Sequence, residues 1–377
     1  MMQSPGPFFY LIAFPLMLGP LVFIHELGHY LAARWCGIKS EVFSIGFGSE
    51  VWGRTDRHGT RWKLSWIPLG GYVRFAGDMN PASQPDPTWL ALPADERQRT
   101  FQAKPLWQRA IVVLAGPAAN FLLAFLILLG FTLAYGTDRT PSTVGGIEPK
   151  TAASAAGLQT GDRITAISGR PMATFEDLVM YVQLRAGERA HIEFERGGVA
   201  MARDVVIGID HRKDKFGNQA DVGLLGIRPP KPVFERVGVL EAPGIALEQV
   251  SAIVRQTGDG LGQLITGRRP IKDMSGVVGM AKISGEQLSL GWDYFVWLVA
   301  LISINLGFIN LLPVPMLDGG HLLFYAIEAV RRRPVTPAIQ EWAFRGGLAA
   351  ILCLFLVVTF NDLGKVGLWQ HLAGLIG

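Results

Sequence analysis

The stretch MMQSPGPFFYLIAFPLMLGPLVFIHELGHYLAARW, residues 1–35, combines a long apolar run with a cluster of ionisable side chains. No charged residue occurs from Met1 to Ile24, and the pentapeptide His25-Glu26-Leu27-Gly28-His29 follows directly. On a helix, two histidines four positions apart share one face and can bind one zinc ion, while the Glu between them can act as a general base. Ionisable residues inside a membrane span are costly and usually functional. We therefore predict that residues 7–34 form a transmembrane helix that carries part of a metal site.

The composition indicates a membrane protein. Of 377 residues, 49% are hydrophobic and 18% are charged, and the apolar residues gather in blocks long enough to cross a bilayer as helices. Basic loops beside membrane spans explain the net charge of +4, so we predict no nucleic-acid binding. The predicted spans are residues 7–34, 106–135, 294–317 and 342–360.

The distribution of Lys and Arg predicts how the spans are oriented. The loop over residues 35–105 is rich in basic residues, and the loop between the last two spans contains Arg331-Arg332-Arg333. Because basic loops remain on the cytoplasmic side, both loops are predicted to be cytoplasmic. Residues 136–291 are then placed outside the cytoplasm by parity.

The cytoplasmic loop contains a stretch near residues 62–75 that predicts a β-hairpin. Two runs of alternating apolar and polar residues flank Gly70-Gly71, which predicts a turn at this pair. The stretch is rich in aromatic and aliphatic residues for a cytoplasmic loop. We therefore predict that it re-enters the membrane, where irregular backbone must be covered by protein or a water-filled cavity.

The segment after the second span predicts a small β-rich domain and a helical linker. Residues 143–229 contain short alternating runs punctuated by glycines, with one short helix over residues 175–184. Residues 230–291 are predicted to be an amphipathic helical linker, with a break near residues 258–262.

A hydrolytic zinc site needs a third protein ligand and an open position for water. The best candidate is Asp318, at the end of the third span and three residues after Pro315. Pro313 and Pro315 interrupt helical hydrogen bonding. The first and third spans run in the same direction, so Asp318 and both histidines lie toward the cytoplasmic ends of their spans. The alternative for Asp318 is an N-cap of a helix that starts near His321.

These residues predict a mechanism of peptide hydrolysis. Zinc lowers the pKa of its bound water and polarises the scissile carbonyl, while Glu26 accepts the water proton and passes it to the leaving amine. Asn310 and Asn120 are polar side chains in apolar spans that can bind the substrate or stabilise the oxyanion. A helix–helix hydrogen bond is an equal alternative for each. For His321, we expect a supporting role, with a spare ligand as the alternative.

Together these motifs resemble the site-2 protease family of intramembrane zinc metalloproteases, and most closely its bacterial RseP-type members. Residues 67–73 (IPLGGYV) are similar to the membrane-re-entrant β-loop of that family. Residues 155–164 (AAGLQTGDRI) and 224–229 (LLGIRP) are similar to parts of a PDZ domain. The motifs that carry the resemblance in the spans are His25-Glu26-x-x-His29, Gly116-Pro117-Ala118-Ala119-Asn120 and Asn310 through Asp318-Gly319.

The resemblance implies a polytopic α-helical membrane protein with about four transmembrane helices, a re-entrant β-hairpin and one inserted extracytoplasmic PDZ-like domain. It places the protein in the bacterial inner membrane, with the active site toward the cytoplasm and the PDZ-like domain in the periplasm. It implies cleavage of a single-pass membrane protein, such as an anti-sigma-factor remnant, after another protease has removed the outer part. The implied roles are zinc ligation by His25, His29 and Asp318, base catalysis by Glu26, and substrate contacts by Asn310 and the loop residues Leu69, Gly70, Gly71, Tyr72 and Val73.

Two other functions are compatible with the sequence. One is a non-catalytic membrane protein that recruits partners through its PDZ-like domain, and the other is a zinc transporter or sensor. Glu26 favours the protease, because metal binding alone needs no base. The PDZ-like domain is single, where RseP-type members often have two, and it is expected either to bind a substrate C-terminus or to exclude bulky outer domains.

Overall fold

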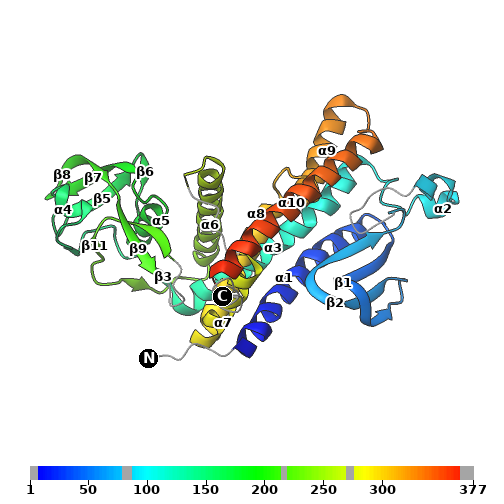
Figure 1. Cartoon of the computed structure of the whole chain (residues 1–377), viewed down its shortest axis with the longest axis horizontal. Helices are drawn as coiled ribbons and strands as arrows, with labels where there is room; N and C mark the ends of the chain where they lie inside the picture. Colours follow the sequence, from blue (N-terminus) through cyan, green and yellow to red (C-terminus); the bar gives the residue numbers. More distant parts are fainter. Residues whose placement is uncertain (1–6, 79–86, 214–218, 269–275, 366–377) are drawn as a thin grey trace, which may run out of the picture. The chain divides into compact units, whose positions relative to one another are not determined.

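The computed structural model describes residues 7–78, 87–213, 219–268 and 276–365. They form two compact units (Figure 1). The first, here called the helical unit, lies within residues 1–128, 247–254 and 275–362. The second, here called the β-rich unit, lies within residues 129–246 and 255–274 and the residues after 362.

Four helices of the described residues are long and apolar enough to cross a bilayer, which agrees with the predicted fold class. Each supplies a stretch of 19 to 30 residues with few charged side chains. An apolar helix of this length hydrogen-bonds its own backbone, which is a requirement inside a membrane. The helices are α1 (Pro7–Trp35), α3 (Leu106–Tyr135), α8 (Trp292–Asn310) and α10 (Pro337–Lys365).

The third span is shorter than predicted, because α8 ends at Asn310 and not at Leu317. Pro313 and Pro315 lack the N–H that a continuing helix needs, so the chain makes turns instead. A new helix, α9 (Asp318–Arg331), then begins at the predicted ligand.

The predicted linker contains two helices. Helix α6 (Ala242–Ile265) runs without the predicted break near residues 258–262, since glycines within a helix are tolerated. Helix α7 (Val277–Leu290) lies within the predicted helical linker but was not predicted as a separate helix. It packs against α1, where Gly285 lies against the Tyr10 ring. The Asp362 carboxylate of α10 accepts hydrogen bonds from the N–H groups of Gly276 and Gly279, at 2.8 and 3.0 Å, and so caps α7 from another helix.

The hairpin is longer than predicted, and its turn lies elsewhere. Strands β1 (Ser40–Thr55) and β2 (Arg61–Phe75) are joined by residues 56–60, whereas the predicted turn at Gly70-Gly71 lies inside β2. The Asp56 carboxylate makes the turn, because it accepts hydrogen bonds from the N–H groups of His58 and Thr60, at 2.8 and 3.0 Å. Gly70 has a φ of 99°, which permits an irregularity within a strand.

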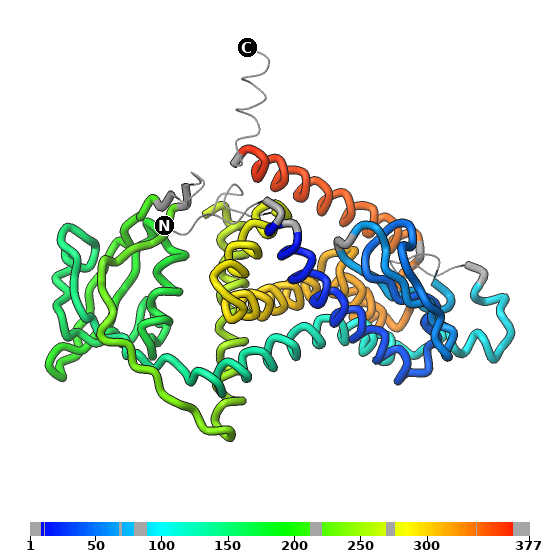
Figure 2. Tube along the Cα trace, turned by 90° about the horizontal axis from the view of Figure 1, so that it is seen from below, coloured from blue at the N-terminus to red at the C-terminus, as the bar shows by residue number. Residues whose placement is uncertain are grey.

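Strand β2 curls so that it pairs with β1 twice. Residues 42–45 of β1 pair with residues 61–64 on one side and with residues 71–74 on the other. No strand of the described residues pairs with the outer side of residues 71–74, which we call the edge segment. The hairpin packs beside α1 through a core that includes Tyr30, Phe43 and Val73 (Figures 1 and 2).

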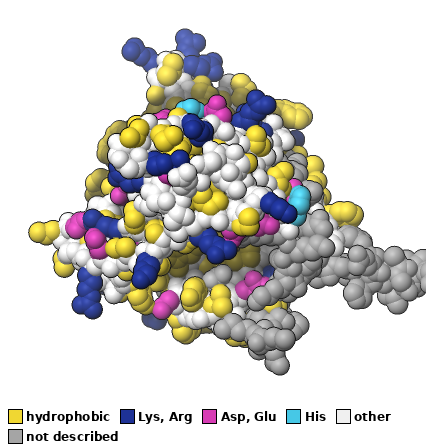
Figure 3. All heavy atoms as spheres, turned by 90° about the vertical axis from the view of Figure 1, so that its left-hand side faces the viewer, with side chains coloured by type: hydrophobic (Ala, Val, Ile, Leu, Met, Phe, Trp, Pro, Cys, Tyr) yellow, Lys and Arg dark blue, Asp and Glu magenta, His cyan; other side chains and the backbone are white. Residues whose placement is uncertain are grey.

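Within the β-rich unit, residues 137–235 contain strands β3 to β12 and are here called the β-rich domain. It has a central four-stranded sheet of order β6-β5-β7-β8, with three further strand pairs, β9–β10, β4–β11 and β3–β12. Its core contains Ile164, Ile192 and Phe194. Figure 3 shows its surface from the side of β8 and α4, with basic and acidic side chains interspersed. The elements are β3 (Thr137–Asp138), β4 (Gly146–Ile147), α4 (Ala152–Ala155), β5 (Arg163–Ile167), β6 (Arg170–Pro171), α5 (Phe175–Gln183), β7 (Arg189–Arg196), β8 (Val199–Val206), β9 (Gly208–Lys213), β10 (Gln219–Leu224), β11 (Ile227–Arg228) and β12 (Phe234–Glu235).

An ion pair between a buried carboxylate and a partly exposed guanidinium stabilises this domain. Arg196 donates to Asp162 from Nε and Nη2 at 2.7 and 2.8 Å, and these hydrogen bonds lower the pKa of the buried carboxylate. Removing Arg196 leaves the buried Asp162 carboxylate without its charged partner, which is destabilising. Arg196→Met should therefore lower the protection of β5 and β7 against hydrogen exchange, measured in the full-length protein.

Arg163→Met is the matched control, since its pair with Glu195 is exposed and should contribute about 1 kcal/mol or less. Because the folded-state pKa of Asp162 is lowered, its contribution is present above the unfolded pKa of about 3.9 and is lost as the pH falls below it. The difference between wild type and Arg196→Met should therefore shrink in acid. Equal protection of both variants at neutral pH would contradict the prediction.

Candidate metal centre

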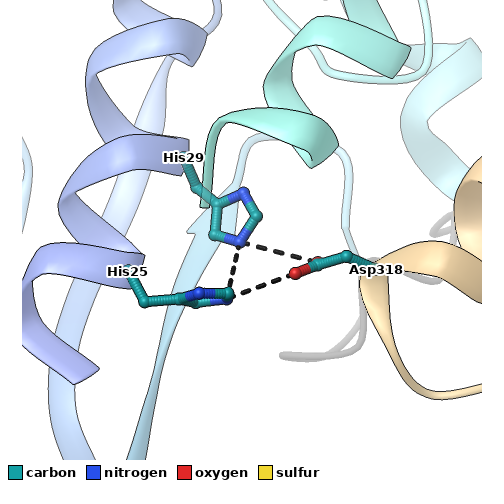
Figure 4. A group of neighbouring side chains, drawn as sticks. All are labelled: His25, His29 and Asp318. Atoms are coloured by element: carbon teal, nitrogen blue, oxygen red, sulfur yellow. Dashed lines mark hydrogen bonds and ion pairs between the residues drawn. The ribbon is translucent and has the colours of Figure 1, made fainter. Parts of the chain in front are cut away.

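The two histidines of the first span meet on one face of α1. Their Nε2 atoms lie 3.2 Å apart, and both rings are buried (Figure 4). This follows from the local sequence, because residues four apart lie on the same side of a helix. Helix α1 therefore presents two imidazole nitrogens toward one point.

The Asp318 carboxylate completes the cluster from the start of α9. Its Oδ2 lies 3.2 Å from Nε2 of His25, and its Oδ1 lies 3.5 Å from Nε2 of His29 (Figure 4). The N-cap of α9 is Leu317, so the alternative prediction that Asp318 is an N-cap is wrong. The carboxylate faces the imidazoles because the preceding turns bring α9 back toward α1.

Tight backbone packing holds Asp318 in place. Met316 has a φ of 84°, a left-handed conformation that is rare for a residue with a long side chain. Such strain clusters at functional sites, where surrounding structure enforces it. A Cβ at Gly319 would overlap the carbonyls of Leu311 and Leu312, and one at Gly320 would overlap the carbonyl of Val314. The paired glycines therefore allow the turn to fold onto the first residues of α9.

Helix α3 supports the imidazoles from the other side. Nδ1 of His29 lies 2.8 Å from the backbone oxygen of Val112, and donation of the Nδ1 proton to this carbonyl leaves Nε2 free to bind a metal. A Cβ at Gly116 would overlap the His29 ring, and one at Gly28 would overlap the carbonyl of Ala115. Glycine at both positions lets α1 and α3 approach closely enough for this contact.

Glu26 lies beside the metal cluster and the edge segment. Its side chain is buried, and its carboxyl group makes a hydrogen bond with the backbone of Val73. A Cβ at Gly71 would approach Cγ of Glu26 to 3.1 Å, so glycine lets the strand pass close to this side chain. Glu26 and the edge segment therefore form one continuous surface.

A cavity of about 290 Å³ opens onto this surface. Among the predicted substrate-binding residues, Asn310 and residues 70–73 line it, together with His25, Glu26, His29 and Asp318. Asn120 is not part of the lining, and its amide Nδ2 instead lies 3.1 Å from Nδ1 of His25. The Leu69 side chain lies outside the described residues. The structure thus brings a strand edge and a polar side chain to the same cavity as the metal cluster.

His321 remains outside the metal cluster. Its ring packs against Phe344, with centroids 5.0 Å apart. His321 lines the cavity but does not belong to the group that can hold a metal ion.

The donor atoms fit a hydrolytic zinc. One ligand atom from each of His25, His29 and Asp318 can be chosen so that all lie within 4.8 Å of one another. Two imidazole nitrogens and a carboxylate oxygen are a ligand set used by catalytic zinc, which keeps a further position for water. Val112 and Gly116 were not predicted as supporting residues, because a backbone carbonyl leaves no sequence signal. The only hint was the Gly-Pro run in the second span.

Comparisons with known proteins agree with this chemistry. Residues 13–354 match the peptidase family M50. "Putative zinc metalloprotease Atu1380" of Agrobacterium fabrum is 42% identical over 95% of this chain and 96% of its own length. "Metalloprotease MmpA" of Caulobacter vibrioides is 38% identical over 97% of this chain and 98% of its own length.

Among solved structures, the PDZ domain of an SdrC-like protein from Listeria monocytogenes matches 24% of this chain and 87% of its own length. The sequence identity is 21% and the TM-score is 0.19.

Proposed function

Since this chain belongs to peptidase family M50 and is a zinc metalloprotease, we propose that it hydrolyses a peptide bond within or near the transmembrane helix of a single-pass membrane protein. One observation carries this proposal. The three candidate ligands, Glu26 and residues 71–73 of the edge segment all line one cavity, which the long apolar helices α1, α3 and α8 also line.

His25, His29 and Asp318 would hold the zinc ion through Nε2, Nε2 and a carboxylate oxygen. Zinc, when bound, lowers the pKa of water and polarises the scissile carbonyl. Glu26, buried at the same cavity, would accept the water proton and deliver it to the leaving amine. Asn310 lines the cavity, where its amide would bind the substrate backbone or the developing oxyanion.

The edge segment would hold the substrate in an extended form. A peptide bond inside a helix is shielded, so the substrate helix must unwind before cleavage. Unwinding exposes backbone N–H and C=O groups, which are costly to leave unpaired inside a membrane. The outer side of residues 71–74 is not paired with any described strand, so an unwound substrate could add to it as a further strand.

Exposed aromatic residues support the proposed position of the spans in the bilayer. Trp35, Trp107 and Trp342 lie at the predicted cytoplasmic ends of α1, α3 and α10, whereas Tyr135 and Trp292 lie at the opposite ends of α3 and α8. Trp and Tyr favour the membrane interface. His25 precedes Trp35 by ten residues, or about 15 Å along a helix, which would place the cavity within the bilayer on the cytoplasmic side.

We further propose a bacterial inner-membrane location, with the hairpin toward the cytoplasm and the β-rich domain in the periplasm. A substrate already shortened by another protease, as with an anti-sigma-factor remnant, would then meet the cavity with little outer mass. The β-rich domain, which the sequence predicts to be PDZ-like, would bind its new C-terminus or exclude intact proteins.

The test uses the purified full-length protein in proteoliposomes with two model substrates. One is a single apolar span with short flanks, and the other carries a folded outer domain on the same span. We expect cleavage of the short substrate inside the apolar segment, located by mass spectrometry, with loss of activity on zinc chelation and recovery on zinc addition. Cleavage confined to aqueous flanks would overturn the proposal for an intramembrane substrate, and equal cleavage of both substrates would remove the requirement for prior processing.

Asp318→Ala tests the ligand set in the same preparation. Even the loss of a residue that only orients a ligand lowers metal affinity about 10–100-fold, so we expect zinc affinity to fall by more than about 100-fold, with loss of cleavage. Asp293→Ala removes the same charge from the first turn of α8 and is the control. Zinc affinity like that of the control would exclude Asp318 as a ligand.

A further inference from the structure

Asn120 lies between α3 and the metal cluster and is completely buried, with 0% of its surface exposed. Its amide Nδ2 lies 3.1 Å from Nδ1 of His25, on the side of the ring opposite to Asp318. Its Oδ1 is also buried and has no hydrogen-bond partner among the residues that the structure describes. A buried amide oxygen without a partner is costly, so this atom calls for a donor.

Asn120 is held firmly from a third helix. The hydroxyl of Ser303 in α8, itself 0% exposed, donates to the backbone oxygen of Asn120 at 2.8 Å. This contact links the backbone of Asn120 to α8. Three helices, α1, α3 and α8, therefore meet at one buried polar contact.

The two imidazoles have equivalent support. Nδ1 of His29 faces the carbonyl of Val112, and Nδ1 of His25 faces the amide of Asn120, both on α3. An imidazole that binds a metal through Nε2 carries its proton on Nδ1 and needs an acceptor there. Val112 supplies a carbonyl oxygen, and half a turn of the Asn120 amide would supply its unpartnered Oδ1.

We propose that Asn120 is a positioning residue for His25 and not a substrate-binding residue. Its Oδ1 accepts the Nδ1 proton of His25, which keeps Nε2 unprotonated and directed toward Asp318. This inference rests on the proposed zinc ligands, and it assigns Asn120 a role in metal affinity and in the geometry of the site.

The test compares Asn120→Leu with Asn120→Asp in the full-length protein, using zinc affinity and the visible spectrum of the cobalt-substituted form. Leu removes the acceptor at similar volume, so we expect zinc affinity to fall about 10–100-fold and the cobalt spectrum to change. Asp retains an acceptor oxygen, so its zinc affinity and spectrum should stay close to those of wild type. Thr132→Val, at another buried position of α3, is the control and should change neither.

Each result bears on one statement. Zinc affinity and cobalt spectrum that are unchanged in Asn120→Leu overturn the inference, and lost cleavage with unchanged zinc affinity in both variants would assign Asn120 to the substrate instead. If Asn120→Leu does not fold, the zinc affinity of Asn120→Asp is the deciding measurement. A loss of zinc affinity of about 10–100-fold in Asn120→Asp, which retains an acceptor oxygen, would overturn the proposed role of Asn120 as an acceptor. Wild-type protein that binds no zinc would overturn the proposed ligand set itself.

Discussion

Glu26→Gln is expected to lower the rate of substrate cleavage by about 10²–10⁴-fold and to leave zinc content unchanged. Gln has nearly the same shape as Glu, so it should fit the buried position beside the Val73 backbone without moving the histidines. It cannot accept a proton from water, so only the transfer step is removed. Cleavage of the short model substrate and zinc content of the same sample are the two measurements.

Glu50→Gln is the matched control, because it removes one carboxylate from the hairpin outside the edge segment, where its partner Arg61 is exposed. Its activity should stay near that of wild type. Cleavage by Glu26→Gln at the rate of the control would remove Glu26 from the mechanism and direct attention to His321, which lines the same cavity. An inactive variant that still binds zinc is also suited to capturing the natural substrate, because bound membrane proteins should accumulate on it.

Gly116→Ala is the second change with a large expected effect. A methyl group at this position would overlap the imidazole of His29, so either the ring or α3 must move. Zinc affinity should fall at least about tenfold, as for loss of an interaction that orients a ligand, and cleavage should fall with it. Equilibrium zinc binding and the cleavage assay measure the two effects.

Gly130→Ala, in the same helix, is the control. Apart from the neighbouring backbone of α3, no described residue has an atom within 4 Å of a Cβ added at Gly130. It should retain zinc affinity and gain up to about 1 kcal/mol of helix stability, since Ala is the better helix former. If both alanine variants bind zinc equally well, the close approach of α3 to His29 is not needed for metal binding. Reduced zinc binding in both would indicate a general defect of α3.

Local sequence was sufficient where the relevant geometry is local. The spacing of His25 and His29 dictates a shared helix face. The prolines before Asp318 interrupt helical hydrogen bonding, although the predicted end of the span at residue 317 came too late, because α8 ends at Asn310. Long apolar blocks dictate membrane helices, because only such segments satisfy the backbone inside lipid. Even the pairing of Asp318 with the histidines could be inferred, since counting spans gives the direction of each one.

Where the outcome depended on contacts between distant residues, sequence patterns were insufficient. Gly70-Gly71 has the composition of a turn, yet the turn of the hairpin is made by the Asp56 side chain. Gly70 instead permits an irregularity within β2, and Gly71 lets this strand pass close to Glu26. A curled strand that pairs twice with its neighbour leaves no periodic signal, because the pairing depends on long-range packing.

Contacts between distant residues also determine helix α7 and the surroundings of the metal cluster. Helix α7 is short, and it is stabilised by α1 and by a cap from Asp362, so its own sequence gives little indication of a separate helix. Asn120 could be recognised from the sequence as a polar residue in an apolar span. Whether its side chain faces the substrate cavity or His25 depends on how α1 and α3 are rotated about their axes relative to each other. Residue type and spacing thus specify the chemistry, whereas helix rotation, strand curvature and backbone carbonyls specify which atoms carry it out.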